Sequence, residues 1–264
     1  MNTLIRTRID PEIMHHHYID RFAYQDSPIH RIDPRAKTLA VAAYSAVLIS
    51  LPGTMIPSPW FSVFPFALLV WGGIPLRFVA KHTLIVSPFI LCLVALAPVF
   101  DRQPVQVGES MIARGWLTAG SILVRFVFGM AALIALASTT RFPNLLKGLE
   151  KLGVPRLLVS QLRFLYRYLF LLLDEAMHLR QARASRDAGK GPLMGRWRAS
   201  AGLVGVLFVR TLDQAERTHL AMIARGYDGT IRLTEPLAWR FFDTIFVLVT
   251  ALYLLVLRAV HGWF

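Results

Sequence analysis

Five apolar stretches, each long enough to cross a lipid bilayer as one helix, constrain this chain more than any other feature of its sequence. About 30 Å of hydrocarbon takes roughly 20 helical residues, or fewer at the short end. A soluble core would have to bury all of these runs at once, whereas lipid solvates them without that packing problem. The stretches lie near residues 36–52, 60–76, 84–100, 117–138 and 238–260.

The basic residues indicate which ends of these stretches face the cytoplasm. The chain has 29 Lys and Arg against 16 Asp and Glu, a net charge of +13 that in a soluble protein would suggest nucleic acid as the partner. In a membrane protein, Lys and Arg accumulate in cytoplasmic loops instead. With the N-terminus inside, the segment from Thr139 to Arg240 holds seventeen basic residues, the arm through Lys37 holds six, and the outside keeps three. We therefore predict an inside N-terminus, an outside C-terminus and no nucleic-acid partner.

The long cytoplasmic segment has a helical pattern throughout. Phe142–Leu152 reads as a short helix stopped by Gly153 and Pro155. From Arg156 to about Arg186, leucines recur every three or four residues, so one stripe of a long helix should face a partner. After the glycine-rich break at 188–192, a second long helix is predicted from about Ala199 to Arg225.

These patterns predict an all-α polytopic membrane protein with about five transmembrane helices and a cytoplasmic pair of long helices. The predicted divisions are an N-terminal cytoplasmic arm, four transmembrane helices, a cytoplasmic helical domain, and a fifth transmembrane helix with the C-terminus. Their bounds are 1–35, 36–138, 139–237 and 238–264.

Both long helices finish with an arginine beside small residues. The two tips are Ala184, Ser185 and Arg186, and Ala224, Arg225 and Gly226. An arginine in the last turn with glycine beyond it is a common way to cap a helix. A slim basic tip can also enter a groove in a partner, where the guanidinium forks onto a carboxylate. Two tips could engage two copies of a partner, and capping alone does not require the pairing.

Two stretches of the sequence resemble one family of membrane proteins. They are Ile19–Tyr24 followed by Ser27–Lys37, with its Asp-Pro-Arg-Ala-Lys run, and Glu216–Gly229, with its Ala-Arg-Gly motif. Together they resemble the T subunits of energy-coupling-factor transporters, most of all the cobalt and nickel branch of the CbiQ/NikQ type. The first tip departs from the family pattern, because Asp187 follows Arg186 and glycine comes only at position 189. Arg183 therefore stays open as an alternative docking arginine.

The resemblance implies a multi-pass scaffold of the bacterial inner membrane that serves an importer of cobalt or nickel ions. Such a subunit binds two cytoplasmic ABC-type ATPases through its two helix tips and holds a separate substrate-binding membrane subunit, of the CbiM/NikM type, amid membrane lipid. The chain carries no G-x-x-x-x-G-K-[ST] phosphate loop, so hydrolysis should be left to the partners. We expect no cofactor, no catalytic residue and no enzymatic activity of the chain alone.

Other polar residues leave two rival functions open. Three consecutive histidines after Met14 suggest a metal clamp, but adjacent side chains in an extended segment point to opposite faces, so we predict no metal site there. A membrane enzyme with its site at the cytoplasmic face would use carboxylates such as Asp174 and Glu175, which at helical spacing beside arginines more simply serve as ion partners. A stand-alone ion carrier would need polar groups within the membrane, where Arg125 should face protein or water.

Overall fold

Helices occupy all five apolar stretches that the sequence predicts to span the membrane. The computed structural model describes residues 23, 27–53, 55–101, 103–107, 110–185, 193–228 and 239–262. The five helices are α1 (Pro34–Ser50), α2 (Val63–Trp71, preceded by the 3-10 turn η3, Pro59–Ser62), α3 (Leu76–Phe100), α4 (Arg114–Thr139) and α8 (Phe241–Gly262). By length and composition, α3, α4 and α8 can each cross a membrane, and Pro59–Trp71 is a shorter apolar helix. The prediction of an all-α polytopic membrane protein is confirmed.

The chain divides into two units. The membrane unit comprises residues 1–152 and 237–264, and the α6–α7 unit comprises residues 153–236. The second unit contains α6 (Arg156–Ala184) and α7 (Leu193–Ala224). The short helix α5 (Phe142–Lys151) belongs to the membrane unit, where it packs against α1. Gly153 lies just beyond α5 with a φ of 104°, a left-handed conformation that favours glycine and ends the helix where the sequence predicts.

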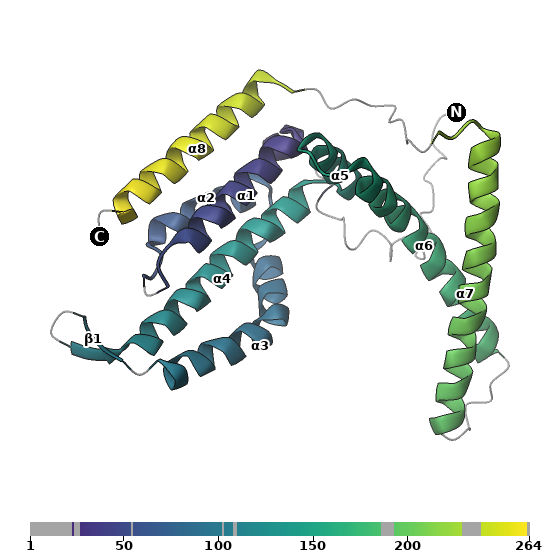
Figure 1. Cartoon of the computed structure of the whole chain (residues 1–264), viewed down its shortest axis with the longest axis horizontal. Helices are drawn as coiled ribbons and strands as arrows, with labels where there is room; N and C mark the ends of the chain where they lie inside the picture. Colours follow the sequence, from purple (N-terminus) through teal and green to yellow (C-terminus); the bar gives the residue numbers. More distant parts are fainter. Residues whose placement is uncertain are drawn as a thin grey trace, which may run out of the picture. The chain divides into compact units, whose positions relative to one another are not determined.

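Within the membrane unit, α1 lies between α8 and α4 (Figure 1). The small side chains Ala36 and Ala40 and the ring of Tyr44 are buried along its length. The Tyr44 hydroxyl donates a 2.8 Å hydrogen bond to the Phe61 carbonyl oxygen, and its ring stacks on Phe64 with 4.9 Å between the centroids. This buried aromatic cluster holds the short α2 segment against α1.

The most extensive helix packing in the membrane unit is between α3 and α4. Figure 1 shows α3 changing direction along its length, and Pro88, which removes one helical hydrogen bond, lies inside the helix. At the far end of the pair, a Cβ atom placed on Gly115 would lie 2.5 Å from Pro98 Cα and 2.6 Å from the Ala97 carbonyl oxygen. Glycine at position 115 is therefore what lets the start of α4 approach the end of α3.

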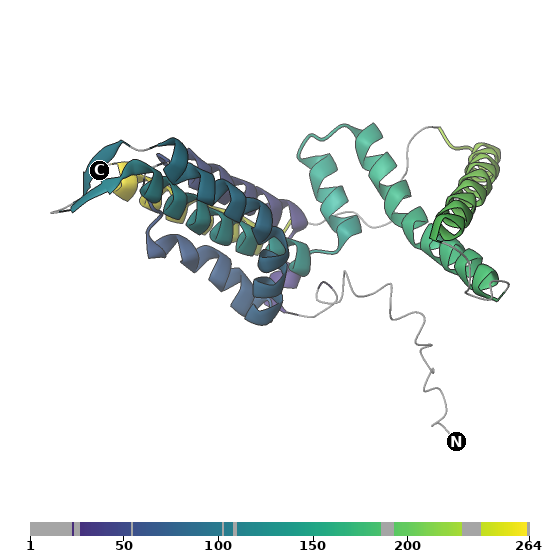
Figure 2. The ribbon, with the colours of Figure 1, turned by 90° about the horizontal axis from the view of Figure 1, so that it is seen from below.

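The outer loop and the start of α7 differ from the sequence-based expectation. The predicted outer loop between α3 and α4 contains an antiparallel hairpin of β1 (Pro104–Val107) and β2 (Ser110–Ala113), with Pro104 opposite Ala113 (Figure 2). The helix α7 begins at Leu193 rather than near Ala199. The basic residues between 193 and 199 interrupt the apolar pattern, but they are good helix formers, so the backbone hydrogen bonds continue through them.

Candidate functional site at the tips of α6 and α7

The end of α7 forms a compact cap in which the Ala-Arg-Gly motif takes part. The Tyr227 N–H donates to the Met222 carbonyl oxygen at 3.0 Å, and the Gly226 N–H donates to the Ile223 carbonyl oxygen at 2.9 Å. These two bonds define a Schellman motif, which requires a left-handed residue at the position of Gly226. The φ of Gly226 is 80°, as the motif demands.

This cap accounts for Gly226 but not for the side chain of Arg225. The capping bonds use backbone groups only, and the Arg225 side chain is exposed. Among the residues that the structure describes, no hydrogen bond or ion pair involves the Arg225 guanidinium. Ala224 and Gly226 on either side are also exposed, so the guanidinium projects from a slim surface.

The first tip ends differently. Ser185 caps α6, with its N–H bonded to the Gln181 carbonyl oxygen at 3.0 Å and its hydroxyl donating to the same oxygen at 3.1 Å. Ala184 and Ser185 are both exposed. Arg186, the arginine predicted to dock here, lies outside the described residues. The alternative, Arg183, donates a 2.9 Å hydrogen bond from Nη1 to Ser200 Oγ of α7.

The two helices cross, and their contacts place the tips apart. An ion pair between Glu175 of α6 and Arg210 of α7 lies at the crossing, and the Arg183–Ser200 bond lies nearer to the end of α6. The contacts pair later residues of α6 with earlier residues of α7, so the helices run antiparallel where they cross. From Ser200 to Ala224, α7 extends roughly 36 Å at about 1.5 Å per residue. The tips are thus not one site but two.

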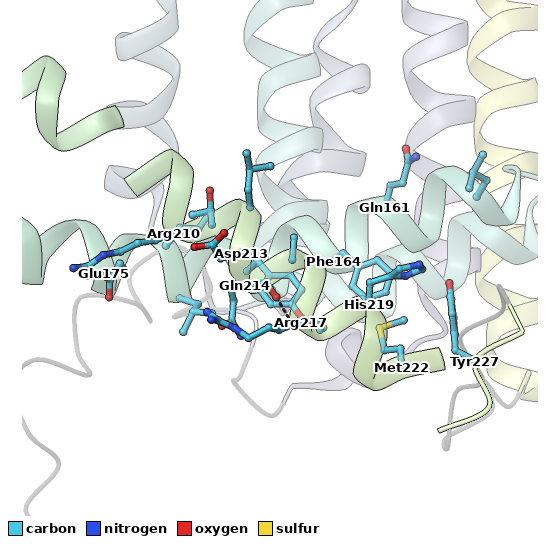
Figure 3. Close-up of a pocket in the computed structure, with 18 residues that line it drawn as sticks. Gln161, Phe164, Glu175, Arg210, Asp213, Gln214, Arg217, His219, Met222 and Tyr227 are labelled. Carbon is cyan, nitrogen blue, oxygen red and sulfur yellow. Dashed lines mark hydrogen bonds and ion pairs between the residues drawn. The ribbon is translucent and has the colours of Figure 1, made fainter. Parts of the chain in front are cut away.

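A groove of about 1200 Å³ runs between the first two-thirds of α6 and the second half of α7 (Figure 3). Its α6 wall is largely apolar, and its α7 wall carries most of the polar groups, including Asp213, Arg217 and His219. The α6 residues recur every three or four positions, apart from the adjacent Leu171 and Leu172, and are Leu157, Gln161, Phe164, Tyr168, Leu171, Leu172 and Glu175.

The leucine stripe predicted to face a partner lies mostly on a different face of α6, and only Leu172 of its leucines lines the groove. Leu158, Leu162, Leu165 and Leu169 are exposed, with Leu165 at 59% of its full exposure. The helix therefore carries two apolar faces, one toward the groove and one uncovered. A single-stripe interpretation missed the groove because aromatic rings and Gln161 interrupt the leucine pattern along it.

The described residues add little support for a metal site or for a membrane enzyme. No group of three or more His, Cys, Asp or Glu within the described part of the chain could hold a metal ion, and His15–His17 lie outside that part. Glu175 serves as an ion partner, as predicted, but its partner Arg210 lies on α7 and not at helical spacing within α6. Asp174 also has an interaction of its own.

Arg125 faces protein, which was one of the two predicted alternatives. Its Nη2 donates hydrogen bonds to the carbonyl oxygens of Pro52 and of Met55, the second at 3.2 Å. Ser121, one turn earlier in α4, donates to the same Met55 oxygen at 3.0 Å. These carbonyls belong to the irregular connection between α1 and η3, where no helix supplies donors. Arg125 therefore satisfies backbone groups and is not free to line an ion path.

Comparison with known proteins shows which proteins this chain is similar to. A sequence model of the family CbiQ, described as cobalt transport protein, matches residues 25–236. The energy-coupling factor transporter transmembrane protein EcfT of Listeria innocua is 29% identical over 249 residues, covering 88% of this chain and 94% of that protein. The cobalt transport protein CbiQ of Salmonella typhimurium is 30% identical over 168 residues, covering 62% and 72%. A protein of Methanocorpusculum labreanum named putative fused cobalt transport protein CbiMQ is 31% identical over 117 residues, covering 44% and 19%.

Proposed function

Because this chain belongs to the CbiQ family of cobalt transport proteins, as a transmembrane T component of an energy-coupling-factor transporter, we propose that it links two ATPase subunits to a substrate-binding membrane subunit. In this proposal the tip of α7 docks on one ATPase and the tip of α6 on the other. The chain is a multi-pass membrane protein, and the proposed location is the bacterial inner membrane. The transported substrate is cobalt, and nickel is the alternative.

The exposed Arg225 guanidinium is the observation that carries the docking proposal. A Schellman cap ends α7 without using this side chain, so capping explains only part of the motif. A guanidinium presents several donors in a rigid plane and binds a carboxylate through two parallel bonds. Exposed alanine and glycine beside it would let the tip enter a narrow groove. The docking site on the ATPase is therefore expected to be a groove that contains a carboxylate.

The separation of the tips supports two ATPase copies rather than one. A stretch of roughly 36 Å from Ser200 to Ala224 exceeds the diameter of a small domain, which is about 30 Å. One groove could not enclose both tips at once. Two copies of the same ATPase, each receiving one arginine-bearing tip, would use both.

The substrate-binding partner is proposed to resemble CbiM. The Methanocorpusculum labreanum relative is named as a fusion of CbiM and CbiQ, and a chain that joins two components suggests that they work side by side. The CbiQ match covers residues 25–236 of this chain, and we propose that the CbiM-like component is a separate subunit.

The experiment is recovery of partners from native membranes with tagged chain, comparing wild type with Arg225→Glu. We expect the wild type to retain an ATPase and a small membrane subunit, identified by mass spectrometry, and the variant to lose the ATPase. Arg77→Glu, the same charge reversal at an exposed position of α3, is the matched control and should retain it. Equal ATPase recovery with Arg225→Glu would show that this arginine does not dock.

A further inference from the structure

Three helix ends of the membrane unit meet at a buried group of charged side chains. The group consists of Asp33 at the start of α1, Lys37 one turn later, Asp243 in the first turn of α8, and the carbonyl oxygen of Thr139 at the end of α4. All four residues are buried, and Lys37 and Asp243 keep only 3% and 2% of their exposure. Charged side chains are rarely this buried unless they are paired.

Asp243 joins the N-termini of two helices. Its Oδ2 accepts a 2.7 Å hydrogen bond from the Arg240 N–H directly before α8, which is one half of a capping box. Its Oδ1 accepts a 2.8 Å bond from the N–H of Asp33, the residue that caps α1. Asp33 in turn accepts from the Arg35 N–H at 2.8 Å, so each carboxylate lies where a helix N-terminus stabilises negative charge.

Lys37 completes the group by joining α1 to α4. Its Nζ donates a 2.8 Å hydrogen bond to the Thr139 carbonyl oxygen, which has no helical donor because α4 ends at that residue. Lys37 also interacts electrostatically with Asp33 and Asp243. Removal of its charge would leave those carboxylates in a buried site with less compensation.

Both connections to the α6–α7 unit leave from elements held at this group. On one side, α5 follows α4 and packs on the start of α1, where a Cβ atom on Gly148 would lie 3.4 Å from the Arg35 nitrogen and from Pro34. On the other side, the chain returns from residue 236 to Arg240, whose N–H is bound by Asp243. The two connections to the α6–α7 unit are therefore attached to helices whose ends this group of side chains holds together: α4 and α1 through α5, and α8 through Arg240.

We propose that Asp33, Lys37 and Asp243 form a positioning cluster that makes the ends of α1, α4 and α8 respond as one body to movement of the α6–α7 unit. This inference rests on the proposed function, because it assumes that ATPases move the tips of α6 and α7. Two bonds of the cluster join different helices: the Asp33 N–H to Asp243 links α1 to α8, and Lys37 to the Thr139 carbonyl oxygen links α1 to α4. Loss of either bond removes one of these links. Without the cluster, a movement of the α6–α7 unit transmitted through α5 or through residue 240 would shift a single helix. That movement would then not drive transport.

The test uses the complete transporter reconstituted in liposomes, with cobalt uptake and ATP hydrolysis measured together. Lys37→Met keeps the length of the side chain but removes its charge and its donor. We expect the ATPases to remain bound, hydrolysis to continue, and the cobalt taken up per ATP to fall by about tenfold. Lys81→Met, at an exposed position of α3, is the matched control and should leave that ratio unchanged.

A second variant tests the proposal independently, in case Lys37→Met fails to fold. Asp243→Asn keeps the shape of the side chain but leaves one acceptor oxygen where two N–H groups are bound, and the uptake per ATP should fall in the same direction. A lower yield or melting temperature of either variant, with normal uptake per ATP in the assembled complexes, would overturn the positioning role and leave a structural one. Failure of the wild-type chain to bind any ATPase would instead refute the proposed function itself.

Discussion

Arg183 of α6 donates a 2.9 Å hydrogen bond to Ser200 of α7, which seats the last turn of α6 against the first third of the antiparallel partner helix. The bond engages one of the two arginines considered for docking at this tip. It also keeps the tip of α6 far from Arg225 along α7. A partner that binds the tip of α6 therefore meets an Arg183 side chain that is already hydrogen-bonded, and it cannot reach Arg225 at the same place.

The first prediction distinguishes the two arginines of the α6 tip. Since Arg183 is bound to Ser200, Arg186→Glu should reduce ATPase recovery from membranes more than Arg183→Glu does. Ser200→Ala removes the acceptor of Arg183 and serves as the control for loosening of the helix pair. A larger loss with Arg183→Glu than with Arg186→Glu, at normal recovery for Ser200→Ala, would assign the docking role to Arg183.

The second prediction concerns the close approach of α3 and α4. Gly115→Ala should lower the free energy of unfolding by about 1–3 kcal/mol, because the added methyl group would overlap backbone atoms of Pro98 and Ala97 that cannot move independently. Thermal unfolding in detergent measures the loss. Gly120→Ala in the same helix is the control, since its Cβ would lie 3.6 Å from Ile56 Cδ1, an ordinary contact. Equal melting temperatures for the two variants would contradict the prediction.

The third prediction separates a structural Arg125 from one that carries ions. Arg125→Met should destabilise the membrane unit by about 1–3 kcal/mol, because it removes the charged donor shared by the carbonyl oxygens of Pro52 and Met55, which then keep, among the described residues, only the Met55 N–H and the Ser121 hydroxyl as donors. Cobalt uptake per assembled complex should stay at the wild-type level. Arg114→Met, which removes a partly exposed ion pair to Asp101 at 3.6 Å, should cost less than about 1 kcal/mol. Loss of uptake in stable Arg125→Met complexes would reopen the carrier hypothesis.

The fourth prediction tests the orientation in the membrane. In a Cys92→Ser background, which removes the single native cysteine, new cysteines at Gln103 and Ala201 report on opposite faces. Both positions are exposed. A membrane-impermeant maleimide should label Gln103→Cys on intact cells and Ala201→Cys only after permeabilisation, because the basic segments stay inside. The reverse labelling pattern would invert the predicted topology.

Local patterns predicted the helices well because the hydrogen bonds of a helix join residues four apart. The apolar stretches located α1, α2, α3, α4 and α8, and glycine marked the ends of α5 and α7. Boundaries were less accurate where polar residues continue a helix, as in α3, which begins at Leu76 rather than near residue 84. Lipid requires apolar side chains only across its own thickness, whereas the backbone pattern extends beyond it.

The sequence by itself determined the class of the protein, its helices and the two arginine-bearing motifs, because length, hydropathy and turn residues act over a few neighbouring positions. Only the tertiary structure decided that Lys37, counted in the sequence among the basic residues of the cytoplasmic arm, is buried, binds the carbonyl oxygen at the end of α4 and interacts electrostatically with Asp33 and Asp243. The same holds for the carbonyl partners of Arg125 and for the groove between α6 and α7. Each of these depends on how helices far apart in the chain are rotated and shifted against one another, and no local pattern of residues encodes that register.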